Sequence, residues 1–147
     1  GVGAGGILTG NVRRVAVSPH AGISWRTDGG FLFAVHDVLS ILPPIGGNGT
    51  GVDNRISLAL GYASESFDLS AGPSLSFYYL PLCATSYCGR VVGLSPGAAL
   101  QVHGYFAGPL GLSLSAAVSW VGGASFLLPG GVSATVIAGP VLRWSTK

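Results

Sequence analysis

The chain has 147 residues and a net charge of +2, with 8% charged residues, 48% hydrophobic residues and 25 glycines. Soluble domains carry roughly a quarter charged residues, so these few charges cannot cover a soluble globule, and the hydrophobic content excludes a disordered chain. The longest basic run is only Arg13-Arg14. The chain therefore lacks the basic patch of a nucleic-acid-binding protein, and this class is excluded. The length fits one domain, residues 1–147, that meets lipid or other protein over much of its surface.

The apolar segments favour strands over helices. Residues 91–142 contain no Asp, Glu, Lys or Arg, but glycine and proline interrupt them repeatedly, and the longest run without either is residues 112–121. A membrane-spanning helix needs about 20 apolar residues, whereas a tilted membrane strand needs about 9–11. The run therefore has the length of a membrane strand.

Apolar residues alternate with small or polar residues along most of the chain, which is the period of a strand. The glycine-rich opening, with Val2, Ala4 and Leu8, is spaced towards the same alternation. A soluble sheet carries charged side chains on its wet face, but here the second face is mostly Ser, Gly and Ala. The pattern favours a membrane barrel, with the apolar face towards lipid and the small face in the lumen. In chain order the expected strands lie near residues 2–8, 15–26, 31–36, 55–63, 68–79, 99–106, 112–120 and 132–144.

The connections between these strands alternate in length. Short turns are expected at residues 27–30, 64–66 and 107–109, and long connections at residues 39–53, 80–92 and 122–131. Aromatic residues gather near the strand ends, as in the aromatic belts of membrane proteins. Short turns at one end and long loops at the other are typical of bacterial outer-membrane barrels. The sequence therefore predicts an all-β, eight-stranded antiparallel up-and-down transmembrane β-barrel with both termini periplasmic.

The last expected strand alternates apolar residues from Val136 and ends in the aromatic Trp144, although Ser145-Thr146-Lys147 follow it. It is similar to the C-terminal signal that the barrel-assembly machinery reads. Over its whole length the chain resembles the small eight-stranded outer-membrane barrels of Gram-negative bacteria, the OmpA/OmpX-like group. The resemblance implies a bacterial outer membrane, with outer-membrane lipid and lipopolysaccharide as neighbours. It carries no activity onto this chain.

Cys83 and Cys88 lie in one of the long connections. A structural zinc site needs four ligands, and no second pair supplies them. A local disulfide is the favoured interpretation, with two free thiols as the alternative. The disulfide would contribute roughly 2 kcal/mol by the chain-entropy argument and implies an oxidising compartment.

The sequence offers little catalytic or cofactor chemistry. Gly1, Gly3 and Gly6 match the spacing of a dinucleotide fingerprint, but that motif must open a helix, and residues 7–26 have the pattern of a turn and a strand. His20, His36 and His103 are expected in the lumen as hydrogen-bonded filler, and no serine is distinguished as a nucleophile beside them. We expect no catalytic residues, no metal and no cofactor.

Four charged residues are expected in the lumen near the short turns: Arg26, Glu65, Asp68 and Arg143. Buried charges need partners, so these residues are predicted to form an ion-pair network at the periplasmic end. The alternative is a charge-selective constriction.

Two apolar patches fall within long connections: Leu42 and Ile45 in one, and Phe126, Leu127 and Leu128 in the other. Exposed apolar patches often mark contact sites, so these residues are candidates for contact with a protein partner or a neighbouring subunit, unless they fold over the barrel mouth. The leading hypothesis is a non-enzymatic outer-membrane barrel that acts as a structural anchor or interaction scaffold through its extracellular loops. The alternative is a narrow pore for water or small ions, and an enzyme ranks third.

Overall fold

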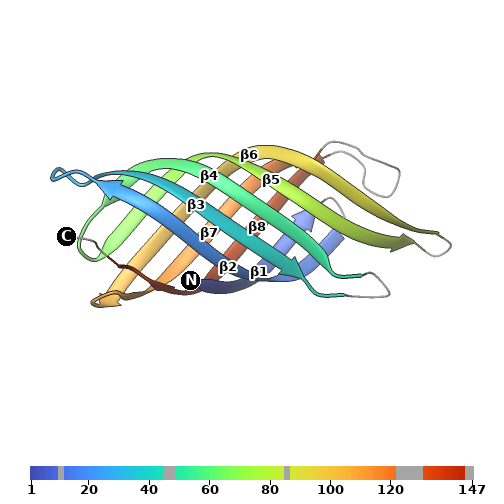
Figure 1. Cartoon of the computed structure of the whole chain (residues 1–147), viewed down its shortest axis with the longest axis horizontal. Helices are drawn as coiled ribbons and strands as arrows, with labels where there is room; N and C mark the ends of the chain where they lie inside the picture. The colour runs from blue at the N-terminus through green and yellow to red at the C-terminus, as the bar shows by residue number, and fades with distance from the viewer. Residues whose placement is uncertain (10–11, 45–48, 85–86, 122–130, 145–147) are drawn as a thin grey trace.

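The computed structural model is a closed barrel of eight antiparallel strands, in which each strand pairs with the next and β8 pairs with β1 (Figure 1). It describes residues 1–9, 12–44, 49–84, 87–121 and 131–144. The predicted all-β, eight-stranded antiparallel up-and-down barrel is confirmed. The strands are β1 (Val2–Thr9), β2 (Val12–Arg26), β3 (Phe31–Leu42), β4 (Gly51–Ala63), β5 (Phe67–Ala84), β6 (Tyr87–Ala107), β7 (Leu110–Val121) and β8 (Gly131–Leu142).

The alternation along the strands separates an apolar outer face from a filled interior. On β7, Leu112, Leu114 and Val118 are exposed, whereas Ser113 and Ser115 between them are buried. On β4, β5 and β6 large apolar residues are likewise exposed and serines are buried, whereas the inward face of β3 is mostly apolar. An outer face of this kind is the face that a membrane barrel presents to lipid. The inside-out assignment made from the sequence is confirmed.

One residue interrupts the apolar outer face in the middle of β3. Asp37 is exposed on this face, in register with Ala21 of β2 and Ile56 of β4. Its outward position was not predicted from the sequence. A carboxylate on a lipid-facing position is unfavourable, though less so than an arginine there.

The end of the barrel with the short turns is called the short-turn end. It carries the turns at residues 27–30, 64–66 and 108–109, the first residue of β1 and the last residue of β8. Gly30 and Gly108 adopt positive φ angles of 81° and 60°, a conformation that glycine takes without steric cost. The predicted short turns are therefore confirmed, and the start of β1 and the end of β8 lie at the same end of the barrel.

The opposite end, called the loop end, differs from the expectation at two of its connections. The expected loop over residues 39–53 is shorter, because β3 continues to Leu42 and β4 begins at Gly51. The expected loop over residues 80–92 is a two-stranded extension, in which β5 and β6 stay paired from Leu80↔Val91 to Ala84↔Tyr87. Backbone groups that reach beyond the barrel still need hydrogen bonds, and the neighbouring strand provides them. Residues 122–130 of the third expected loop lie outside the described residues.

The extended β5–β6 hairpin projects beyond the other strands at the loop end (Figure 1). Cys83 and Cys88 are direct cross-strand partners within it. Such pairs have Cβ atoms about 4.5–5.5 Å apart, close to the separation of about 3.5–4.5 Å in a disulfide. The side chain of Cys83 lies outside the described residues, so the disulfide stays a prediction.

Within the described residues, no helix is long and apolar enough to cross a membrane.

We expect Leu58→Arg to prevent stable insertion. Leu58 is 52% exposed on the outer face of β4, and an arginine near the bilayer midplane costs about 2–4 kcal/mol. The measurement is folding into lipid vesicles, monitored by heat-modifiable migration in gels. Asp28→Arg, in the exposed turn between β2 and β3, is the matched control and should fold like the unmodified chain. Equal folding of both variants would contradict the lipid-facing assignment of Leu58.

We expect Cys83 and Cys88 to be bonded to each other in the folded barrel. Intact-mass measurement with an alkylating agent should show no added alkyl group before reduction and two after it. Two alkyl groups added without reductant would show free thiols instead.

Candidate functional site in the barrel lumen

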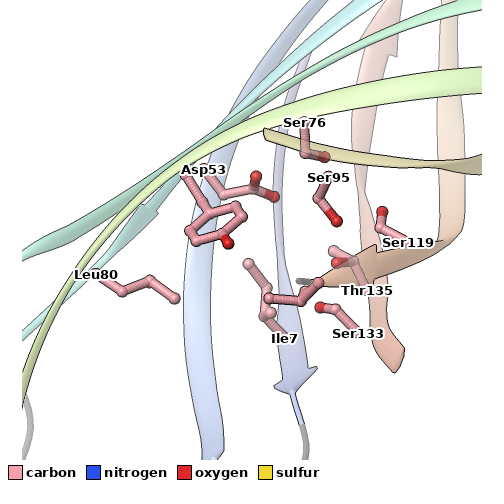
Figure 2. A pocket seen from close by; sticks show the side chains of 10 residues that line it. Ile7, Asp53, Ser76, Leu80, Ser95, Ser119, Ser133 and Thr135 are labelled. Carbon is pink, nitrogen blue, oxygen red and sulfur yellow. The ribbon is translucent and has the colours of Figure 1, made fainter. Parts of the chain in front are cut away.

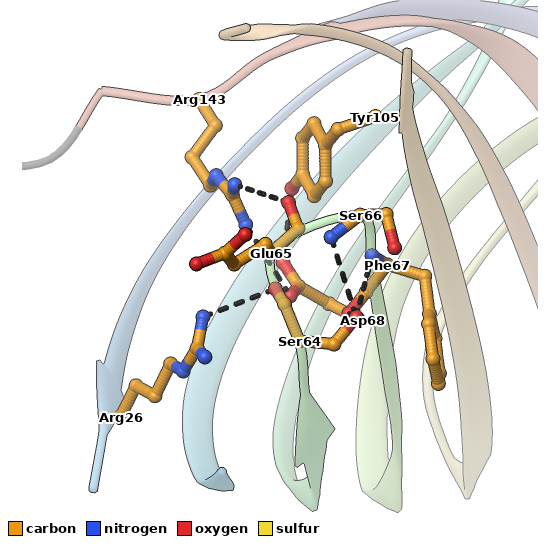
Figure 3. A network of polar contacts seen from close by, with 8 residues as sticks. All are labelled: Arg26, Ser64, Glu65, Ser66, Phe67, Asp68, Tyr105 and Arg143. Atoms are coloured by element: carbon orange, nitrogen blue, oxygen red, sulfur yellow. Dashed lines mark hydrogen bonds and ion pairs between the residues drawn. The ribbon is translucent and has the colours of Figure 1, made fainter. Parts of the chain in front are cut away.

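The short-turn end of the lumen holds a polar cluster built around Asp68 (Figure 3). Arg143 Nη1 lies 3.6 Å from Asp68 Oδ1, and the Tyr105 hydroxyl donates to Asp68 Oδ2 at 3.0 Å. The Arg143 guanidinium also stacks on the Tyr105 ring, with Cζ 3.9 Å from the ring centroid. Asp68, Tyr105 and Arg143 therefore form one unit that ties β5 and β6 to the end of β8.

The structure brings together only part of the predicted charge network. Asp68 and Arg143 form the ion pair, but Arg26 donates to the backbone carbonyl of Ser64 at 3.0 Å. Glu65 contributes its backbone carbonyl, which accepts from Arg143 Nη2 at 2.9 Å. Glu65 sits at the exposed tip of a turn in which the Ser64 hydroxyl accepts from the backbone N–H groups of Ser66 and Phe67. The turn therefore presents carbonyl groups, and not the Glu65 carboxylate, to both arginines.

A layer of histidines lies next along the lumen. The rings of His36 and His103 meet edge to face, with centroids 5.8 Å apart. Ser70 Oγ lies 3.4 Å from His36 Nε2, and Ser113 Oγ lies 3.2 Å from His20 Nε2. The three histidines lie in the lumen, as expected, and contact one another or serine hydroxyls. In the described part of the chain, no three His, Cys, Asp or Glu side chains are placed to hold a metal ion.

Arg55 crosses the middle of the lumen and is 2% exposed. From β4 its Nη2 donates to Ser115 Oγ on β7 at 2.9 Å, while its Nε has no hydrogen-bond partner. Arg55 was not among the charged residues predicted to form the lumen cluster. The sequence pattern could have indicated Arg55 as a lumen charge, because it is a charged residue at an interior position of a cleanly alternating strand. An arginine in this position fills the section of the lumen that small serines leave open.

A small cavity lies on the loop-end side of Arg55. Figure 2 shows the side chains that line it. Its volume is about 30 Å³, enough for about two water molecules at about 10–15 Å³ each. Polar groups converge on this space from several strands, and apolar side chains close it on the loop side. The lining includes Asp53, Ser76, Ser95, Ser119, Ser133 and Thr135 together with Ile7, Tyr78, Leu80 and Val121.

The loop end of the lumen is closed by a cluster of buried apolar side chains, here called the apolar cap. Leu42 belongs to it and is 1% exposed, which corrects its prediction as part of an exposed loop patch. The reason is that β3 continues to Leu42, whose position in the alternation points it inward. The other four contact candidates, Ile45, Phe126, Leu127 and Leu128, lie outside the described residues. The apolar cap consists of Leu42, Tyr78, Leu80, Val91 and Val121, with Ile7 packed against it.

The comparisons with known proteins agree with this fold. The chain is similar to the crystal structure of Neisserial surface protein A (NspA), with a TM-score of 0.62 and 12% sequence identity over 97% of this chain and 93% of that chain. NspA is an eight-stranded Neisserial outer-membrane β-barrel. No protein-family model and no curated protein matches the chain. At this identity the likeness confirms the predicted resemblance to the small eight-stranded outer-membrane barrels at the level of the fold.

We expect Asp68 and Arg143 to stabilise the barrel jointly. In a double-mutant cycle of Asp68→Asn and Arg143→Gln, measured by urea unfolding in detergent, the coupling free energy should be about 1 kcal/mol, the upper range for a partly exposed ion pair. A cycle of Asp68→Asn with Arg26→Gln is the control. Its coupling should be near zero, because Arg26 contacts the Ser64 carbonyl. Equal coupling free energies in both cycles would contradict this assignment and would support the four-residue network predicted from the sequence.

Proposed function

We propose that the chain is a non-enzymatic bacterial outer-membrane β-barrel that acts as a structural anchor and, through its loop end, as an interaction scaffold. In this proposal the short-turn end and both termini face the periplasm, and the loop end faces the cell exterior. Its immediate partners are outer-membrane lipid and lipopolysaccharide, with a protein partner or neighbouring subunit contacted at the loop end.

The apolar outer face supports the membrane location. Outward aromatic residues lie near the short-turn end, where Trp25 contacts Phe33 and Tyr62 contacts Phe67 at ring-centroid distances of 5.5 and 6.0 Å. Trp120 is exposed near the loop end of β7. Two aromatic girdles flanking an apolar band are typical of outer-membrane barrels, and short turns in such barrels are periplasmic.

The filled lumen favours an anchor over a pore. Arg55 spans the lumen to Ser115, and the apolar cap closes its loop end. An eight-stranded barrel has an interior just wide enough for side chains to fill. Solutes that cross would have to displace a buried arginine and a set of packed apolar groups. The specificity of such a barrel must then lie on its outside and at its loop end.

The observation that favours the alternative, a narrow pore, is the serine lining of the lumen and the cavity between Arg55 and the apolar cap. Small hydroxyl side chains form hydrogen bonds with water. A pore would need the apolar cap and Arg55 to move aside together.

We expect the unmodified barrel to give no discrete conductance steps in planar bilayers. The variant Leu42→Ala/Arg55→Ala/Tyr78→Ala, which thins the cap and removes the central bridge, should give frequent steps. Leu58→Ala, on the outer face, is the control and should remain silent. Steps from the unmodified barrel would favour the pore, and a change in the mass of added lipids on incubation with it would favour an enzyme.

A further inference from the structure

The outer face carries a groove that crosses the β2–β1–β8 surface next to the loop end. Its volume is about 540 Å³. On the outer face, Gly6 of β1 lies between Val15 of β2 and Val136 of β8 in the register of the sheet. Because Gly6 has no side chain, the two valines flank a depression in the lipid-facing surface. The lipid-facing groove is lined by Gly6, Leu8, Arg13, Val15, Ala134 and Val136, with parts of Ile7 and Arg14.

Arg13 is the charged residue at the loop end of this groove. It is exposed on the outer face and pairs in register with Leu8. Within the described residues it forms no ion pair and no hydrogen bond through its side chain. A guanidinium beside an apolar groove, without an anionic partner among the described residues, is complementary to an anion that is attached to an apolar chain.

The position of Arg13 along β2 sets the depth at which this anion would lie. Twelve positions separate Arg13 from Trp25, which is exposed near the short-turn end of the same strand. At about 3.3 Å per residue and a tilt of about 45°, this separation corresponds to about 28 Å along the membrane normal. The apolar band of such barrels is about 25 Å tall. Arg13 therefore reaches the headgroup level at the loop end.

We infer that the lipid-facing groove binds lipopolysaccharide, with a lipid A phosphate on Arg13 and an acyl chain along Gly6. Arginine recognises phosphate through paired, charge-assisted hydrogen bonds, and the groove floor supplies the apolar contact. The inference rests on the proposed function in one respect, namely that the loop end faces the outer leaflet. In that leaflet lipopolysaccharide is the lipid that carries both phosphate groups and acyl chains. The barrel would thus hold one lipid at a fixed position on its surface.

Native mass spectrometry of the detergent-purified barrel with added hexa-acylated, bis-phosphorylated lipid A tests this inference. The unmodified barrel should retain one lipid A molecule. Arg13→Gln should weaken binding at least about tenfold, as expected for the loss of a charge-assisted hydrogen bond. Gly6→Leu should weaken it similarly by filling the groove. An added Cβ at Gly6 lies 3.7 Å from its nearest neighbour, the Arg14 carbonyl oxygen, so the barrel itself can accept a side chain there.

Matched controls separate this site from general effects. Arg90→Gln removes another exposed arginine near the loop end. Gly104→Leu adds the same side chain at a glycine of β6 where a Cβ meets nothing within 4 Å. Both variants should bind lipid A like the unmodified barrel, and heat-modifiable migration should show that all four variants fold.

The outcomes decide both parts of the inference. Unchanged lipid A binding in Arg13→Gln and Gly6→Leu, or equal losses in the controls, would overturn the site. Tighter binding of phosphatidylglycerol than of lipid A through the same two residues would overturn lipopolysaccharide as the occupant. Neither result depends on conductance, so failure of the site is distinguishable from failure of the anchor function.

Discussion

Filling the lumen is the constraint on which the rest of this structure depends. A closed barrel satisfies its backbone hydrogen bonds between strands, so its outer face is free to be apolar, but eight strands leave an interior that side chains must occupy. This chain fills it in sections, with the Asp68–Arg143 pair at the short-turn end and Arg55 in the middle. Histidines and hydroxyl groups lie between these charges, and the apolar cap closes the loop end. Because the serines are small, a few large side chains determine whether the barrel is open.

The same arrangement explains how much of the fold could be predicted from the sequence. Where the interior is polar, as along β7, the contrast between the two faces is sharp, and the strands and their inward and outward sets were predicted correctly. Towards the loop end the interior becomes apolar. On β3 the inward residues Val38 and Leu42 are apolar, while Asp37 faces outward. The alternation of hydrophobicity disappears there although the strand continues, so the predicted strands ended too early.

The polar site was predictable only in part for a different reason. Alternation indicates the face on which a residue lies, but not which atoms a long side chain reaches. Arg26 and Glu65 were placed correctly near the short turns, yet the Ser64–Phe67 turn offers its carbonyl groups to the arginines. Tyr105 and Arg55 were not predicted to take part in the lumen contacts, because their partners come from segments distant in sequence. Contacts across the barrel depend on the register between strands, which a single sequence does not determine.

The pairing of β1 with β8 has a consequence for how the barrel assembles. The other pairings in the described barrel join strands that follow one another in the chain, whereas this one joins residues such as Gly6 and Val136. Contacts between distant segments carry the largest loop-closure entropy and form slowly. The β1–β8 seam should therefore close after the neighbouring hairpins have formed. The lipid-facing groove lies across this seam, so its two walls come together only on closure, and a lipid held there would favour the closed ring over the open sheet.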